Sequence, residues 1–305
     1  MKKQASKFLA AKGLIAAAVL GFTAAASAAP INLPGGEQIF EDDNIEYLTN
    51  SQGVVYNARG ADANHTLIVG DQLHATITFS FIRDADDFST IDLKGNSNNA
   101  IIELTGISVI EVKSINPDGS LVFGASAAFE ATYGMGALAA LFVQDPGNYN
   151  ESCTTGGNIA TCEGRATDGS AYMTFGFGDA DDFWVADSSL PSTGLSGVTI
   201  GQAAAISQGT SFGTANYALS ILSNNSGYEF NEQLSALSPI FAPGGDGFAD
   251  VVGSGALQGG RGLANPWFAT SDFQFQLDVV PAPGSLALLS LGLLGMWGAA
   301  RRRKN

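Results

Sequence analysis

Short blocks of apolar residues, separated by clusters of glycine, asparagine, aspartate and serine, run through the middle of the chain. In the block 73–82, isoleucine or phenylalanine at positions 77, 79 and 81 alternates with threonine or serine at positions 76, 78 and 80. Successive side chains of a strand point to opposite faces, so this block predicts a strand with one apolar face. The same reasoning predicts strands over 54–56, 101–112, 120–123, 172–177 and 273–279.

Turn residues support an all-β fold. Asn116-Pro117-Asp118-Gly119 stands between two of the apolar blocks and predicts a hairpin. Helical patterns are sparse: residues 137–143 suit a helix or a buried strand, 203–206 and 215–222 are equally ambiguous, and 231–237 suits a short helix. No linker divides residues 29–280, so we expect one extracellular β-sandwich of jelly-roll or Greek-key type.

The first 28 residues have the three parts of a signal peptide. Four lysines, at positions 2, 3, 7 and 12, precede an apolar stretch over 13–26, and Ala26-Ser27-Ala28 fits an A-x-A cleavage site. We therefore expect an N-terminal signal helix that is removed on export.

The last 25 residues also form a tripartite segment. Pro281, Ala282, Pro283 and Gly284 come first, an uncharged apolar run follows to residue 300, and Arg301, Arg302, Arg303 and Lys304 close it. At about 1.5 Å of rise per residue, a helix over 284–300 is just long enough to cross a thin hydrocarbon core. The basic residues would then remain in the cytoplasm.

This tail resembles the PEP-CTERM sorting signal of Gram-negative bacteria, with Ala282 in place of the usual glutamate of the Pro-Glu-Pro box. The resemblance implies an exosortase as partner and an inner-membrane tether for the precursor. It further implies cleavage near the proline box and delivery to the cell surface or the exopolysaccharide matrix. The alternative is a tail anchor that is never cut.

Charge is distributed unevenly between these segments and the body of the chain. All 29 acidic residues and only six basic ones lie between positions 29 and 280, which gives the body a formal charge of −23. Phosphate binding requires clustered Lys and Arg, so this charge argues against nucleic acid as a partner. It suits a well-solvated secreted surface and also attracts divalent cations.

The chain has two cysteines, Cys153 and Cys162. Export would bring both into an oxidising compartment, so we expect a disulfide between them. A metal site or a catalytic thiol is the alternative, and neither histidine of the chain, His65 or His74, lies nearby in sequence.

Two segments repeat a pattern of aromatic residues that run into an acidic turn. The first turn carries Asp84, Asp86 and Asp87, and the second carries Asp179, Asp181 and Asp182. Carboxylate oxygens suit Ca²⁺, so calcium is a candidate cofactor, although neither turn has EF-hand spacing. The simpler interpretation is a turn whose carboxylates are solvated or accept hydrogen bonds from backbone amides.

Evidence for catalysis is weak. Residues 209–213 match G-x-S-x-G, but that elbow needs a histidine later in the chain, and none follows His74. A pair of carboxylates such as Asp86 and Asp182 leaves a glycan hydrolase as the second alternative. Trp184 and Trp267 are candidate stacking platforms for sugar rings, although strands more often bury such aromatics.

These patterns together predict a non-enzymatic, exported protein of the cell surface or exopolysaccharide matrix, without a catalytic residue or an essential cofactor. A calcium- or carbohydrate-binding extracellular module is the first alternative.

Overall fold

The computed structural model describes residues 31–93, 102–147, 149, 158–190 and 194–280. The predicted signal peptide and sorting tail lie outside these residues. In the described part of the chain, no helix combines the length and the apolar character needed to cross a membrane.

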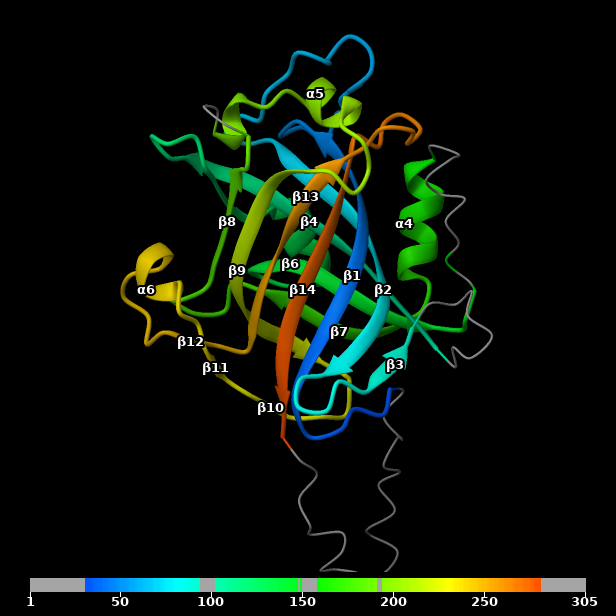
Figure 1. The fold of residues 1–305 in the computed structure, drawn as a ribbon, viewed down its shortest axis with the longest axis vertical. Coiled ribbons are helices and arrows are strands. Elements are labelled where there is room, and N and C mark those ends of the chain that lie inside the picture. Colours follow the sequence, from blue (N-terminus) through cyan, green and yellow to red (C-terminus); the bar gives the residue numbers. More distant parts are fainter. Residues whose placement is uncertain (1–30, 94–101, 148, 150–157, 191–193, 281–305) are drawn as a thin grey trace, which may run out of the picture.

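Antiparallel strands dominate the structure, which confirms the all-β class (Figure 1). The main strands are β1 (Gly36–Thr49), β2 (Gln72–Asp84), β4 (Glu103–Ile115), β6 (Ala137–Gln144), β7 (Ser170–Gly176), β9 (Ser211–Asn224), β13 (Val251–Gly259) and β14 (Ala269–Val279). The shorter strands are β3 (Thr90–Asp92), β5 (Leu121–Ala125), β8 (Phe183–Ser188), β10 (Phe230–Asn231), β11 (Gln233–Leu234) and β12 (Phe248–Ala249). The helices are α2 (Ala127–Tyr133), α4 (Ile159–Thr167), the 3₁₀ turn η1 (Leu195–Gly197), α5 (Ile200–Ala205) and α6 (Ser238–Phe241).

The main strands form one sheet that closes on itself, rather than the two packed sheets of the predicted sandwich. Each main strand pairs with two neighbours in the order β1, β2, β4, β6, β7, β9, β13, β14 and back to β1. The long strands β4 and β9 are also joined at their other ends through β5 and β8. Two-sided pairing of the main strands leaves few exposed edges, so it protects the sheet against pairing with other chains.

The interior of the closed sheet is apolar and aromatic. Phe40 of β1 stacks on Phe275 of β14 with ring centroids 4.8 Å apart, and Phe79 of β2 meets both rings edge-on. A bulge in β2 then changes the alternation, because Asp42 pairs with Phe79 while Glu41 pairs with Phe81. Ile82, rather than Phe81, therefore faces inward opposite Phe40, and both of these side chains are fully buried.

Short helices cover patches of the outer face. Helix α4 lies beside the sheet and packs on β2, β4 and β6 (Figure 1). Its Cys162 and Ala166 are buried in one cluster with Tyr47 and Trp267. Phe129 of α2 packs on β4 and β6, and α6 lies beside β8. These contacts bury apolar residues on the outer face as well as the inner one.

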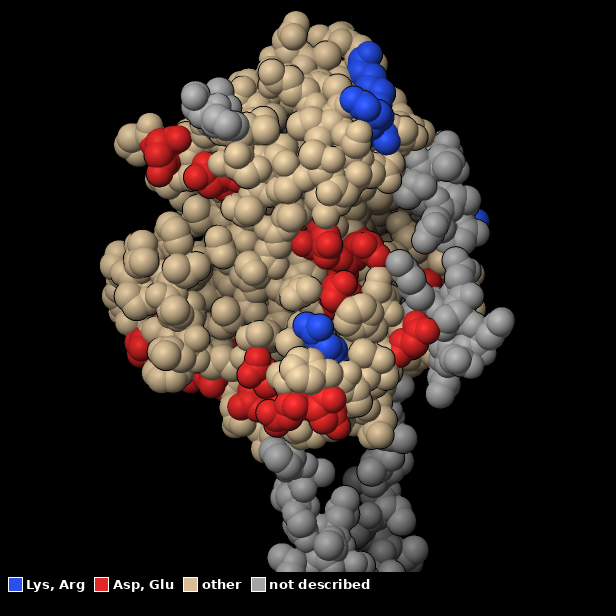
Figure 2. All heavy atoms as spheres, viewed as in Figure 1, with Lys and Arg blue, Asp and Glu red and all other residues tan. Residues whose placement is uncertain are grey.

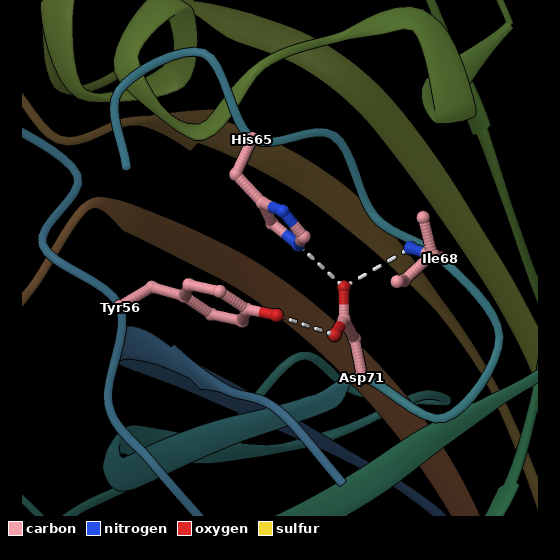
Figure 3. Close-up of polar contacts among 4 residues, drawn as sticks. All are labelled: Tyr56, His65, Ile68 and Asp71. Carbon is pink, nitrogen blue, oxygen red and sulfur yellow. Dashed lines mark hydrogen bonds and ion pairs between the residues drawn. The ribbon is translucent and has the colours of Figure 1, made fainter. Parts of the chain in front are cut away.

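One end of the closed sheet is covered by the loop 50–71 together with η1 and α5 (Figure 1). The loop pairs with this region through a bridge between Thr66 and Thr199. Its fold is held by Asp71, whose carboxylate accepts hydrogen bonds from Tyr56 Oη at 3.0 Å and Ile68 N at 3.0 Å and contacts His65 Nε2 at 2.7 Å (Figure 3). Asp71 is almost fully buried, so these contacts fasten the covering loop rather than leave a reactive carboxylate.

Several local predictions are confirmed and others are wrong. The hairpin at Asn116–Gly119 joins β4 and β5, and Gly119 has the left-handed φ of 85° that its turn requires. Residues 137–143 form strand β6, not a helix, because they are buried between β4 and β7. Residues 231–237 hold the ends of β10 and the short strand β11 instead of a helix, and 54–56 belong to the covering loop instead of a strand.

Candidate functional site

Three polar side chains occupy the inner face of strand β1. Asp42, Asn44 and Glu46 lie at alternate positions and are 5%, 5% and 2% exposed. The same face carries fully buried Phe40 on one side of them and Leu48 on the other. This inner polar strip, as we call these three residues, therefore interrupts an otherwise apolar interior.

The hydrogen bonds of the inner polar strip leave one of its acceptor oxygens without a donor. Asn44 Nδ2 donates to Asp42 Oδ1 at 3.0 Å and to Ser271 Oγ at 3.1 Å, and Asp42 Oδ1 also accepts from Phe273 N at 3.1 Å. Asn44 Oδ1 is buried and has no hydrogen-bond partner. An unpaired buried oxygen lowers the stability of the folded state by about 1–3 kcal/mol. Such oxygens are rare in folded proteins, so each one calls for an explanation.

Burial also changes the protonation of the two acids. It raises the pKa of Asp42 well above its usual range, and the neighbouring charges of Asp43 and Asp272 act in the same direction. It raises the pKa of Glu46 to about 7, against a smaller lowering by a hydrogen bond with Ser271. The strip therefore holds carboxyl groups whose charged forms are disfavoured unless something compensates them.

The strip lines a cavity of about 80 Å³ inside the closed sheet. Trp184, Tyr217 and Phe273 line the same cavity, with Trp184 stacked on Tyr217 at a centroid distance of 4.6 Å. The Tyr217 ring lies against the bare backbone of β13, since a Cβ on Gly253 would stand only 2.3 Å from it. Leu67 of the covering loop and Leu195 of η1 also line the cavity.

This site was not predicted, because no strand was expected over residues 36–49. Apolar and polar residues do not alternate along this segment, because the positions that face inward include Phe40 as well as Asp42, Asn44 and Glu46. The available signal was the two-residue spacing of Asp42, Asn44 and Glu46 itself, which places all three on one face once a strand is assumed.

The first acidic turn uses its carboxylates to accept backbone hydrogen bonds. Asp84 Oδ1 accepts from Asp86 N at 2.8 Å and Asp87 N at 3.2 Å, and Asp87 Oδ1 accepts from Ser89 N at 2.8 Å. A hydrogen bond from Gln38 and those from the backbone amides of Asp86 and Asp87 lower the pKa of Asp84. The turn thus contains the backbone hydrogen bonds that the simpler interpretation expects, and calcium binding stays a prediction.

The second acidic turn is built differently, although its sequence is similar. Asp182 Oδ2 accepts from Gly178 N at 2.6 Å, Asp179 N at 3.1 Å and Ser220 Oγ at 2.8 Å, while buried Asp181 accepts from Gly247 N at 3.1 Å. Desolvation raises the pKa of Asp182 to about 6. Throughout the described ranges, no group of three or more His, Cys, Asp or Glu side chains is arranged to hold a metal ion.

Both candidate stacking tryptophans are buried. Trp267 is fully buried and meets Tyr47 edge-on at 5.2 Å, and Trp184 lies in the interior. Neither ring presents a face to a polysaccharide at the surface, because Trp184 packs on Tyr217 and Phe273 and Trp267 is buried in the cluster under α4. Cys162 is buried in α4, and Cys153 lies outside the described residues, so the disulfide stays a prediction.

The G-x-S-x-G segment does not form a nucleophile elbow. Ser211 begins strand β9, and its Oγ donates to Gly213 O at 2.8 Å. The elbow requires a sharp turn from a strand into a helix, and here the chain continues as a strand.

Comparison with known proteins identifies the tail. A family model described as the PEP-CTERM protein-sorting motif matches residues 279–304. No curated protein and no solved structure matches the chain. This motif implies an exported protein of a Gram-negative bacterium, whose precursor is anchored in the membrane and processed by an exosortase.

Proposed function

We propose that this chain is a non-enzymatic protein of the cell surface or exopolysaccharide matrix, released there after an exosortase cuts its membrane-tethered precursor. The observation that carries the proposal is the sorting motif together with its position relative to the closed sheet. The motif begins at Val279, the last residue of β14.

The position of the motif allows cleavage without damage to the fold. Val279 pairs with Gly36 of β1 and with Phe230 of β10, so the sheet is complete where the motif starts. The proline box at 281–283 follows directly. Cutting the chain there would leave every described strand intact.

The same pairing places both ends of the domain together. Strand β1 starts beside the end of β14, and the covering loop 50–71 with α5 lies at the opposite end (Figure 1). In a tethered precursor the covered end would point away from the tail. Acidic side chains gather near the end where β14 finishes, and few basic ones share that face, which favours a solvated surface (Figure 2).

The contacts of the two histidines support a non-enzymatic role. Both ring nitrogens of His74 contact hydroxyl groups, of Tyr47 and Thr49, each at 3.0 Å. His65 Nε2 contacts Asp71 in the loop fastening. Each ring therefore has a structural task, and neither lies beside the cavity.

Replacing Arg301, Arg302 and Arg303 by alanine tests the route. We expect the precursor to be retained or mislocalised, with loss of the protein from the surface and matrix fractions, because the basic end is part of the signal. Replacing the same residues by lysine keeps the charge and separates recognition of arginine from membrane topology. Unchanged delivery of the alanine variant, or a wild-type chain whose mass still includes the tail, would contradict the proposal.

A further inference from the structure

We propose that the cavity inside the closed sheet is a binding site for a small alkylamine, whose ammonium group contacts Glu46 and Asn44 while its hydrocarbon part lies against Trp184 and Tyr217. The site is independent of the sorting route. Three observations support the site: the cavity itself, the unpaired Oδ1 of Asn44, which lines it, and the lack of a Lys, Arg or His among the described residues of its wall.

The cavity has a size and a lining suited to a ligand. Its volume of about 80 Å³ exceeds several times the 10–15 Å³ that one water needs. The lining is mainly aliphatic and aromatic, with a few polar groups that converge from β1. Such an apolar pocket with a few convergent polar groups is the usual form of a small-molecule site.

The polar groups accept hydrogen bonds more than they donate them. Asn44 Oδ1 is nine-tenths buried and unpartnered, and Asn44 Nδ2 already donates to Asp42 and Ser271. Glu46 only accepts when it is ionised, which is its state above its pKa of about 7. A ligand that fits must therefore bring hydrogen-bond donors.

Charge favours a cationic donor over a neutral one. Among the described residues that line this cavity, none is Lys, Arg or His, so the cavity wall supplies no cation to the two acids. A buried carboxylate without a partner is strongly disfavoured, and an ammonium group would pair with it. The rings of Trp184 and Tyr217 line the same space and attract cations through their faces.

The size of the cavity limits the ligand. At 10–15 Å³ for each water-sized group, about 80 Å³ accommodates roughly six non-hydrogen atoms. Cyclopentylamine has six, and cyclopentanol is its neutral counterpart of the same shape. These two compounds share the ring and differ in the head group, a cationic ammonium against a neutral hydroxyl.

The test is calorimetric titration of the full chain in lipid nanodiscs at pH 8, with empty nanodiscs as the blank. We expect saturable binding of cyclopentylamine, and binding of cyclopentanol that is at least about tenfold weaker, because a charge-assisted hydrogen bond is stronger than a neutral one. Glu46→Gln should weaken amine binding by at least about tenfold. Glu41→Gln makes the same chemical change on the outer face of β1 and should leave the affinity unchanged.

Three outcomes would overturn the proposal. Absence of saturable binding by the amine would mean that the cavity holds water only, and equal affinity for amine and alcohol would remove the role of charge. The ligand comparison uses wild-type protein alone, so it decides the question even if Glu46→Gln fails to fold. For a folded variant, an unchanged amine affinity would show that Glu46 does not contact the ligand.

Discussion

The two faces of strand β1 bury polar groups in opposite ways. On the outer face, under α4, Tyr47 Oη donates to Glu163 Oε1 at 2.5 Å and contacts His74 Nδ1 at 3.0 Å, while Thr49 Oγ1 contacts His74 Nε2. On the inner face, Asn44 Oδ1 has no partner and the two acids meet no cation from the cavity wall.

This difference separates a structural network from a candidate site. The outer groups form a chain of matched donors and acceptors, consistent with a neutral His74 that carries its proton on Nδ1. A satisfied network of this kind joins α4 to the sheet. The inner polar strip lowers the stability of the folded state, because its unpaired oxygen and its buried acids lack compensating partners in the cavity wall. Buried polar groups of this kind concentrate at functional sites.

The largest effect is expected from removing the centre of the outer network. Tyr47→Ala should destabilise the protein by about 3–5 kcal/mol, because it deletes a buried ring that packs on Trp267 and stacks on His74. Urea unfolding followed by near-ultraviolet circular dichroism measures this loss. Tyr47→Phe keeps the ring and should cost about 1–3 kcal/mol, for the partners left unpaired. Equal stability of wild type and the alanine variant would show that the outer network does not hold α4.

The comparison also explains what the sequence could predict of the fold. Strands β2, β4, β5, β7 and β14 follow apolar blocks whose alternation or turns are visible in the sequence, so the all-β class was predictable. Closure of the sheet was not, because it depends on the pairing of β1 with β14 and of β7 with β9, strands that are distant in sequence. Local patterns carry no information on such pairing.

The candidate site was hidden for a related reason. Polar residues at inward positions of β1 break the apolar alternation by which strands are recognised. The two tryptophans that were expected as surface platforms are buried, Trp184 inside the sheet and Trp267 in the outer cluster under α4. The acidic turns at 84–87 and 179–182 attracted attention through their charge, yet their carboxylates largely accept backbone hydrogen bonds. Clusters of acidic residues in a sequence most often lie at the surface, where water or backbone amides solvate them. The carboxyl groups that indicate a site here are the buried ones of β1.

A second prediction concerns the pH dependence that the inner face imposes. The pKa of Glu46 is about 7 in the folded protein and near 4.5 when unfolded. Between these values the unfolded chain has lost the proton that the folded protein retains, so stability should fall as the pH rises from about 4.5 through 7. A pKa difference of about 2.5 corresponds to about 3 kcal/mol.

Unfolding of wild type and Glu46→Gln at pH 5 and pH 8 measures this effect. The glutamine variant has no proton to lose, so between pH 5 and pH 8 it should gain about 2.5 kcal/mol relative to wild type. Added cyclopentylamine should reduce that difference, because bound amine stabilises the folded state of wild type. A difference that is the same at both pH values would place the ionised Glu46 in solvent rather than in the cavity.

The smallest effect is expected on the outer face and has the opposite sign. Burial lowers the pKa of His74 to about 4, against 6.5 in the unfolded chain, so the unfolded state binds a proton first and stability should fall as the pH drops from 6.5 through 4. The loss should be about 2 kcal/mol, less than the full pKa difference implies, because the ring is only partly buried. The stability of wild type relative to His74→Gln, measured at pH 7.5 and pH 4.5, should decrease by this amount at the lower pH. A change in the other direction would mean that His74 is charged beside Glu163, and the outer face would then be an ion pair rather than a neutral network.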